Sequence, residues 1–170
     1  LDLGCGCGII GLILLHRYQN MGVAVTGIEK QEGLVNLAEK NIKSNNFQHY
    51  FKVICEDIAN TRKIVEPESH SLAICNPPFY TINRGRQNKE HGRSLARHQK
   101  SGAIDDFVKA AAFSIKNKGK AVFIYPSVQV SELVSSCIES RLEPKIMRFV
   151  YPYPLPHSNA NLVLLETAKN

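Results

Sequence analysis

The sequence contains no apolar run long enough to span a membrane, no internal repeat and no low-complexity segment. Its first residues also lack the basic stretch and short apolar segment that mark a secretory signal peptide. The five cysteines include no C-x-x-C pair, so we expect reduced thiols and no zinc or other metal. Together these absences predict a cytoplasmic protein with no membrane partner.

The length and composition suit one folded unit. The chain has 170 residues, of which 44% are hydrophobic, and this fraction is too high for a disordered chain. Residue 1 is a leucine rather than a methionine, and residues 1–3 resemble the end of a buried strand. We therefore expect a single domain over residues 1–170 that is N-terminally truncated, with an upstream segment missing. The oligomeric state is left open.

Apolar runs alternate with helical patterns along the chain, which predicts an α/β fold with a mostly parallel, twisted sheet and helices on both faces. After a first strand that ends at Leu3, we expect strands at 23–29, 51–55, 71–75, 120–125, 147–151 and 161–167. We expect helices at 8–17, 31–41, 105–116 and 128–140, with Asp105 as the N-cap of the third. No helix separates the last two strands, which predicts a C-terminal antiparallel hairpin. Residues 80–104 are expected to form a long loop, and such a loop inside a compact domain is usually either functional or disordered.

A glycine-rich segment, Gly4-Cys5-Gly6-Cys7-Gly8, follows the first strand and opens the first helix. Glycines allow a tight turn and a close approach of the backbone to a ligand. Glu29 ends the second strand, where a carboxylate commonly binds a ribose. These two features alone leave open a nicotinamide-dependent dehydrogenase and a methyltransferase that uses S-adenosylmethionine (SAM).

Two further acids favour SAM. Asp2 stands two residues before Gly4, and a carboxylate near the loop suits a sulfonium cation, whereas it would repel a pyrophosphate. Asp57, after the third strand, is placed to accept a hydrogen bond from the adenine amine of the cofactor. The chain is also too short for a second domain that could supply a dehydrogenase with its acid or base.

The tetrapeptide Asn76-Pro77-Pro78-Phe79 follows the apolar run 72–75. The Asn76 side-chain oxygen and the Pro77 carbonyl can accept the two N–H groups of an exocyclic amine, so that its lone pair points at a donor methyl group. Prolines fix the backbone, and an aromatic face at Phe79 stacks a base for roughly 1–3 kcal/mol. We therefore predict catalytic roles for Asn76, Pro77, Pro78 and Phe79. The structural alternative is that the prolines only end a strand and that Phe79 is a core residue.

Basic charge is concentrated just after this tetrapeptide. Six basic residues and one acidic residue lie between positions 80 and 100, and they account for +5 of the net charge of +6. Such a concentration next to a catalytic motif favours a polyanionic substrate over a solvated loop that only aids solubility. RNA contacts are predicted for Arg84, Arg86, Arg93 and Arg97.

These motifs resemble those of the Rossmann-like class I SAM-dependent methyltransferases, and in particular the bacterial tRNA(Val) adenine N6-methyltransferases. The more specific likeness lies in Asn-Pro-Pro-Phe-Tyr at 76–80 and in Ala-Arg-His-Gln at 96–99. The family has a tyrosine at the position of Phe79 and an acid at that of Gln99. The resemblance implies that Arg97 and His98 lie near the target adenine. The residues predicted to bind SAM or to lie at the reacting centre are Asp2, Gly4, Gly6, Gly8, Glu29, Asp57 and Asn76.

Other functions share the tetrapeptide. An rRNA guanine N2-methyltransferase and a glutamine N5-methyltransferase of release factors also act on an NH2 group conjugated to a ring or carbonyl. The basic segment argues against a protein substrate but does not separate tRNA from rRNA. A DNA adenine methyltransferase would need a target-recognition domain, for which the chain is too short. A non-catalytic RNA-binding module is the remaining alternative.

Overall fold

A computed structural model describes residues 1–78, 93–153 and 159–170, except for the side chains of residues 19 and 93–103. Its sheet has seven strands in the order β3-β2-β1-β4-β5-β7-β6. Parallel pairing joins β3, β2, β1, β4 and β5, while β7 is antiparallel to both β5 and β6. The strands are β1 (Asp2–Leu3), β2 (Val25–Glu29), β3 (Phe51–Cys55), β4 (His70–Cys75), β5 (Ile115–Pro126), β6 (Leu142–Val150) and β7 (Leu162–Lys169).

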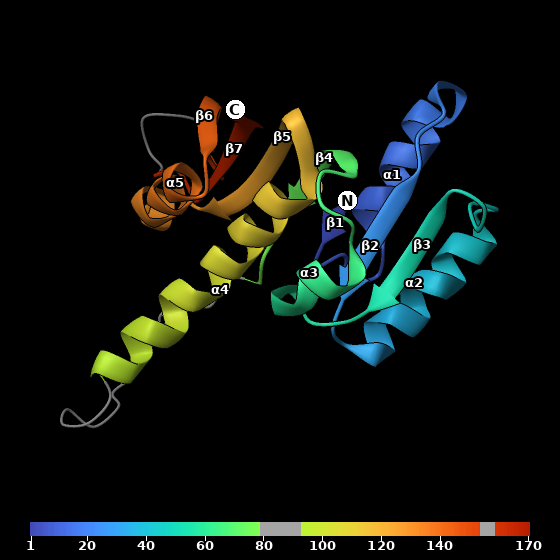
Figure 1. Cartoon of the computed structure of the whole chain (residues 1–170), viewed down its shortest axis with the longest axis horizontal. Helices are drawn as coiled ribbons and strands as arrows, with labels where there is room; N and C mark the ends of the chain where they lie inside the picture. Colours follow the sequence, from blue (N-terminus) through green and yellow to red (C-terminus); the bar gives the residue numbers. More distant parts are fainter. Residues whose placement is uncertain (79–92, 154–158) are drawn as a thin grey trace.

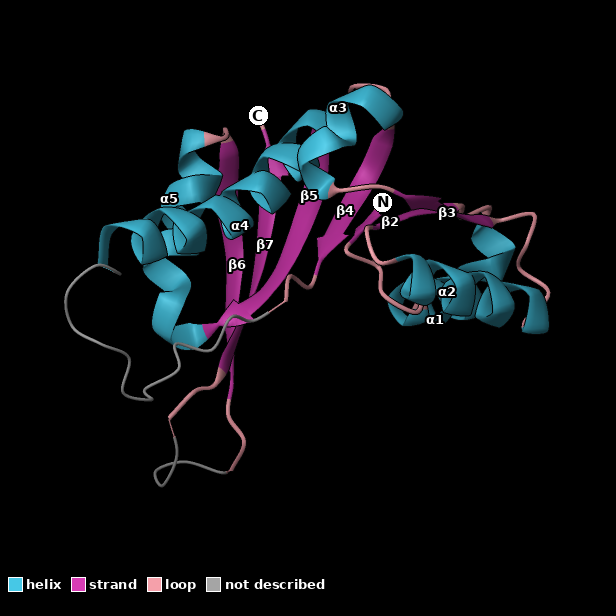
Figure 2. Ribbon diagram, turned by 90° about the horizontal axis from the view of Figure 1, so that it is seen from below, coloured by secondary structure: helices cyan, strands magenta, loops and turns pink. Residues whose placement is uncertain are grey.

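Helices cover both faces of this sheet (Figure 2). The helices are α1 (Ile9–Tyr18), α2 (Glu32–Ser44), α3 (Thr61–Ile64), α4 (Arg93–Ser114) and α5 (Val130–Glu139). Helices α1 and α2 lie against β2 and β3 on one face, and α3, α4 and α5 lie on the other face. Three single 3-10 turns, η1 (Gln19–Met21), η2 (Ile58–Asn60) and η3 (Ser127–Gln129), complete the described elements.

The core is divided by the sheet into two clusters. The smaller cluster, on the side of α1 and α2, contains Leu12, Leu15 and Phe51. The larger cluster contains Leu3, Phe107 and most of the buried residues of β4, β5 and β7. Strand β1 is only two residues long, but both residues are buried and it pairs with β2 on one side and β4 on the other. Strand β1 therefore lies at the centre of the parallel sheet.

The predicted parallel α/β sheet and its C-terminal antiparallel hairpin are confirmed, but one helix boundary was wrong. Helix α4 begins at Arg93, so Asp105 lies inside it and is not its N-cap, and residues 93–104 are helical rather than a loop. A single glycine at position 102 costs a helix only about 1 kcal/mol, and its neighbours are mostly good helix formers. Figure 1 shows the first half of α4 extending away from the sheet.

Strands β5 and β6 each begin five residues earlier than predicted, and the other strand boundaries differ by at most two residues. Strand β5 begins at Ile115, directly after α4, and its pairing with β4 is irregular between His70 and Leu72. Strand β6 begins at Leu142 rather than at residue 147, although it contains Pro144. This proline is tolerated because β6 is an edge strand and its register shifts between Pro144 and Ile146. Helix α3 was not predicted.

Gly11 provides a test of how closely α1 packs on the sheet. A Cβ at this position would lie 2.4 Å from a ring carbon of the buried Phe51, whereas a Cβ at Gly33 in α2 would meet no atom within 4 Å. We expect Gly11→Ala to lower the free energy of unfolding by about 1–3 kcal/mol through overpacking. The matched control Gly33→Ala should raise it by roughly 0.5–1 kcal/mol, because alanine is the better helix former. Urea unfolding of both variants measures the difference, and equal effects would contradict this packing.

Candidate active site

The carboxyl ends of the parallel strands meet at one edge of the sheet, and a cavity of about 350 Å³ lies there. The strand order reverses direction between β1 and β4, which is where open α/β sheets bind ligands. The residues that line the cavity come from the end of β2, from the segments after β1, β2, β3 and β4, and from helices α2 and α4. They are Gly4, Gly6, Glu29, Lys30, Gln31, Leu34, Asp57, Ile58, Asn76, Pro78, Asp106 and Phe107.

The loop after β1 turns sharply away from the sheet. The backbone N–H groups of Gly4 and Cys5 both donate to the Ile28 carbonyl, at 2.8 and 3.0 Å. Gly4 has φ +72°, and a Cβ there would lie 3.1 Å from the Phe107 ring. Both the backbone angle and the space therefore require glycine at this position. Gly6 also has a positive φ, but nothing lies within 4 Å of its missing Cβ, which leaves its backbone accessible from the cavity.

Glu29 connects the glycine loop to the end of β2. One carboxylate oxygen accepts a hydrogen bond from the Gly6 N–H at 3.1 Å, and the other accepts from the Gln31 N–H at 2.9 Å. The side chain is only 6% exposed, yet it lines the cavity. Because an ionised carboxylate offers about four acceptor positions, two remain for a ligand. This geometry suits a pair of ligand hydroxyl groups.

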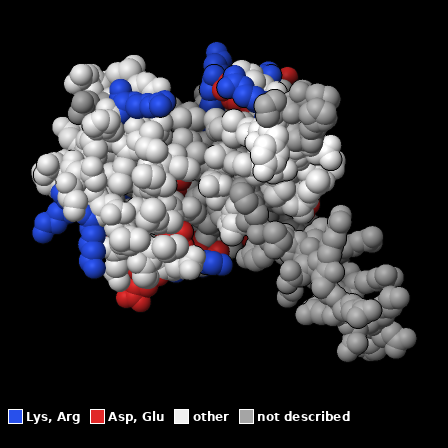
Figure 3. Space-filling model, turned by 180° about the vertical axis from the view of Figure 1, so that it is seen from behind, with Lys and Arg blue, Asp and Glu red and all other residues white. Residues whose placement is uncertain are grey.

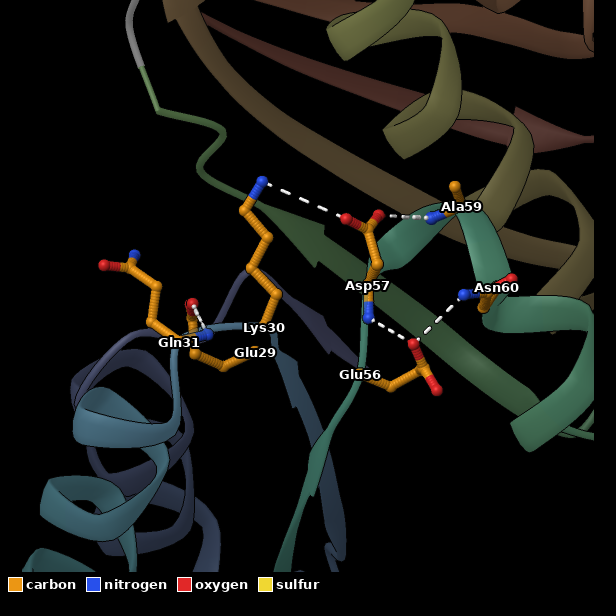
Figure 4. A network of polar contacts seen from close by, with 7 residues as sticks. All are labelled: Glu29, Lys30, Gln31, Glu56, Asp57, Ala59 and Asn60. Atoms are coloured by element: carbon orange, nitrogen blue, oxygen red, sulfur yellow. Dashed lines mark hydrogen bonds and ion pairs between the residues drawn. The ribbon is translucent and has the colours of Figure 1, made fainter.

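The residues that follow β3 form a second network of polar contacts at the site (Figure 4). One Asp57 oxygen accepts from the Ala59 N–H at 3.0 Å and caps the turn η2, while the other lies 3.9 Å from the Lys30 ammonium. Glu56 accepts from the Asp57 N–H at 2.7 Å and from the Asn60 amide at 3.1 Å. These hydrogen bonds lower the pKa of Glu56. Asp57 is thereby held at the cavity wall with its side chain half exposed.

Asp2 lies beneath the glycine loop and does not line the cavity. It is 2% exposed, and one of its carboxylate oxygens has no hydrogen-bond partner among the described residues. Burial is the main reason that the pKa of Asp2 rises to about 6, while a hydrogen bond from the Gly11 backbone acts in the opposite direction. Gly8, the other predicted SAM-binding residue that does not line the cavity, donates to the Cys5 carbonyl at 2.9 Å, and its own carbonyl accepts from the Leu12 N–H at 3.0 Å at the start of α1.

The tetrapeptide continues directly from β4 into the cavity wall. Asn76 and Pro78 are exposed and line the cavity, whereas Pro77 between them is buried. The structure therefore brings Asn76 and Pro78 together with the glycine loop, Glu29 and Asp57. Phe79 lies outside the described residues, so its predicted stacking role stays a prediction.

Most of the residues predicted to contact RNA lie outside the described part of the chain, or only their backbone is described. Arg84 and Arg86 lie in the part of the chain that the structure does not describe, while Arg93, Arg97 and His98 belong to the first turns of α4. Nothing is described of these three side chains. On the face shown in Figure 3, uncharged residues form most of the central surface, and the coloured Lys and Arg side chains lie mostly near the margins. The described side chains on this face therefore do not form one continuous basic patch.

Sequence reasoning missed two residues that α4 brings to the cavity, Asp106 and Phe107. Phe107 is 8% exposed and belongs to the core, but its ring also covers the glycine loop at Gly4. Burial raises the pKa of Asp106, and repulsion from Asp57 adds to this effect. The available signal was a second acid, Asp106, directly after Asp105, for which only a role as N-cap is predicted from the sequence. Lys30, Gln31, Leu34 and Ile58 were also not predicted.

Within the described residues, no three His, Cys, Asp or Glu side chains are grouped closely enough to bind a metal ion. All five cysteines are unpaired, and burial raises the pKa of Cys5 and Cys137 to about 12. None of the described helices is both long enough and apolar enough to cross a membrane.

A second cavity, of about 540 Å³, lies before the amino ends of β2 and β3, next to Asn20 and Tyr50, and contains none of the predicted residues.

Comparison with known proteins identifies the family. The profile of the methyltransferase small domain matches residues 1–134, which is most of the chain. The chain belongs to this methyltransferase family. A curated relative, the tRNA1(Val) (adenine(37)-N6)-methyltransferase of Aliivibrio salmonicida (strain LFI1238), is 28% identical over 134 residues, which are 79% of this chain and 54% of the relative. The chain spans about half the length of such curated relatives.

Solved structures confirm the predicted Rossmann-like class I methyltransferase fold. A predicted O-methyltransferase from Agrobacterium tumefaciens superposes with a TM-score of 0.75 at 19% identity, over 99% of this chain and 72% of that one. The geranyl diphosphate C-methyltransferase of Streptomyces coelicolor A3(2), solved with S-adenosyl-L-homocysteine, gives a TM-score of 0.70 at 12% identity, over 99% and 70% of the two chains. At these identities the likeness concerns the fold of this methyltransferase domain.

Asp2 makes the stability of the domain depend on pH. A folded-state pKa of about 6 lies above the ordinary value of 3.8, so the folded state binds the additional proton between these values. The free energy of unfolding should therefore fall as the pH rises from about 4 to about 6, by roughly 2–3 kcal/mol, and stay low above that range. Asp2→Asn should remove this fall and be the more stable protein at pH 7.5.

Denaturant unfolding at pH 4.5 and 7.5 measures the effect. The control Glu139→Gln removes one negative charge from the exposed end of α5 and should keep the wild-type pH dependence. If Asp2→Asn and the wild type lose the same stability between the two pH values, the burial of an ionisable Asp2 does not determine the pH response.

Proposed function

We propose that this chain binds SAM and transfers its methyl group to an exocyclic amine of a nucleobase, with N6 of adenine in tRNA as the favoured target. One observation carries the proposal: a single cavity joins the glycine loop and Glu29 to Asn76 and Pro78. The first pair of features suits a nucleoside cofactor, and the second suits a planar NH2 group. If cofactor binding and amine binding were unrelated, the two pairs of residues would have no reason to share one cavity.

The residues of the cavity fit SAM. Its volume of about 350 Å³ is within the usual range for small-molecule sites. Glu29 would accept the ribose hydroxyls, Asp57 the adenine amine, and the open backbone of Gly6 would allow close approach of the cofactor. The unpartnered oxygen of the buried Asp2 beneath the loop suits a cationic ligand rather than a pyrophosphate. When bound, SAM supplies an electrophilic methyl group.

Asn76 is the residue that orients the acceptor amine. Its side-chain oxygen accepts one N–H, and the Pro77 carbonyl accepts the other, which favours a pyramidal nitrogen with a directed lone pair. This amounts to positioning and electrostatic stabilisation, and it needs no general base before transfer because the product can lose its proton to water afterwards. Pro78 restricts the backbone next to this point, and Phe79 would stack on the target base.

The substrate class rests on charge and on the relatives. Residues 80–100 concentrate most of the net positive charge directly after the tetrapeptide, and Arg84, Arg86, Arg93, Arg97 and His98 are our candidates for RNA contacts. The curated relative from Aliivibrio salmonicida is named for adenine N6 methylation of a tRNA. An RNA substrate and five unpaired cysteines both fit the cytoplasm.

Replacement of Asn76 tests the orientation of the amine. Asn76→Ala should lower methyl transfer by at least about 100-fold, the usual loss for a positioned transition-state contact, while SAM binding stays within about threefold. Asn20→Ala removes another exposed amide, from the cavity at the opposite end of the sheet, and should change neither quantity. Transfer is measured with labelled SAM, and binding by calorimetry. Wild-type turnover of the Asn76 variant would remove Asn76 from the mechanism.

The chemical identity of the product tests the substrate. The full-length gene product should be incubated with methyl-labelled SAM and with tRNA, rRNA and a release factor in parallel, and the modified residue identified by mass spectrometry. We expect N6-methyladenosine in tRNA. N2-methylguanosine or methylglutamine would retain the amine chemistry but refute the proposed substrate. RNA binding without transfer to any of the three would indicate a non-catalytic RNA-binding module.

A further inference from the structure

Three exposed aromatic residues follow one another at intervals of two where the C-terminal hairpin leaves the sheet. Phe149 in β6 is 42% exposed, and Tyr151 and Tyr153, just after this strand, are 41% and 70% exposed. We name these residues the hairpin aromatic triad. Isolated exposed rings are common, but three within five residues form a local apolar surface that needs an explanation.

The strand pairings place this triad beside the proposed reaction centre. Cys75 pairs with Phe123, so the next residue, Asn76, lies level with Ile124 of β5. Ile124 pairs with Leu164, which in turn pairs with Arg148. The triad thus begins level with Asn76, three strand spacings or about 15 Å away across the sheet, and continues past the same edge. Figure 2 shows β6 and β7 side by side, and β6 runs toward this edge while the antiparallel β7 runs away from it.

The base of the hairpin is held firmly against β5. The Ser127 N–H donates to the Asn161 carbonyl at 3.0 Å, and the Ser127 hydroxyl donates to the Ala160 carbonyl. The Asn161 N–H donates to the Val150 carbonyl at 2.9 Å. The triad therefore projects from a fixed base, and a ligand that stacks on it pays less of the entropy cost of ordering its receptor.

We propose that the hairpin aromatic triad stacks unpaired nucleotides that flank the target base of the RNA substrate, an inference that rests on the proposed function. Aromatic faces are the usual binding surface for unstacked bases, and tyrosine adds a polar tip for groups at the base edge. The exposed Arg148, which precedes Phe149 in β6, adds positive charge to this end of the strand. The triad and the cavity lie along one edge of the sheet, so one strand of RNA can reach both.

Binding measurements on the full-length gene product test the triad. The probes are a labelled single-stranded RNA oligonucleotide, an RNA duplex and a tRNA transcript, each measured by fluorescence anisotropy. The double variant Tyr151→Ala, Tyr153→Ala should bind single-stranded RNA about tenfold or more weakly, in line with the loss of stacking. Its affinity for the duplex should change by less than about threefold, because paired bases do not stack on side chains. SAM affinity should stay within about twofold.

Two controls separate stacking from structural damage. Tyr151→Phe with Tyr153→Phe keeps both rings and should bind single-stranded RNA within about twofold of the wild type. Tyr50→Ala removes a ring of similar exposure (52%) that precedes β3 at the opposite edge of the sheet, and it should not affect RNA binding. Thermal unfolding of every variant shows whether each one remains folded at the assay temperature.

The outcomes distinguish this inference from the proposed function. If the wild type methylates RNA and the alanine variant binds single-stranded RNA normally, the inference alone fails. If RNA binding is unchanged but light scattering shows that the variant has lost a dimer, the triad is a protein contact and the inference is likewise wrong. If the wild type neither binds nor methylates RNA, both fail together.

Discussion

The whole arrangement depends on the two-residue strand β1, which is hydrogen-bonded to β2 on one side and β4 on the other. Because Leu3 is fully buried between these neighbours, the chain must leave the sheet immediately after it. The exit is a turn in which two backbone N–H groups share the Ile28 carbonyl. From this position the chain passes to one face of the sheet, whereas the segment after β4 leads to the other face. The cavity lies between the segment that follows β1 and the segment that follows β4.

Electrostatics divides the site into two regions. Among the described residues that line the cavity, Glu29, Asp57 and Asp106 are acidic and only Lys30 is basic, and the buried Asp2 lies beneath them. Such a surrounding favours a cationic cofactor and disfavours RNA phosphates inside the cavity. The sequence concentrates positive charge in residues 80–100, and Lys145 and Arg148 are exposed on β6. A substrate that offers one base to an acidic cavity and its phosphates to the surroundings matches this division.

The sequence predicted the parallel sheet, its hairpin and most of the cavity wall, because apolar alternation locates strands and strand ends locate sites. The prediction from sequence was wrong or incomplete where tertiary contacts determine the structure. Helix α4 extends past Gly102 although local signals favour a start at Asp105, and no local pattern shows that Phe107 packs over Gly4. Asp2 and Gly8 are essential to the sequence motif, but they support the loop from below rather than face the cavity. The role of Phe79 stays a prediction.

The position of β7 between β5 and β6 has a consequence for how the protein is made. Strand β6 leaves the ribosome before β7, yet its only described strand partner is β7, and β5 also obtains its second neighbour from β7. Until Leu162–Lys169 has left the ribosome, one edge of β5 and the edge of β6 that pairs with β7 are both unpaired. Several apolar side chains on β6 are exposed as well. The half of the sheet that forms the cavity can assemble early, while the half beside it must wait for the final strand.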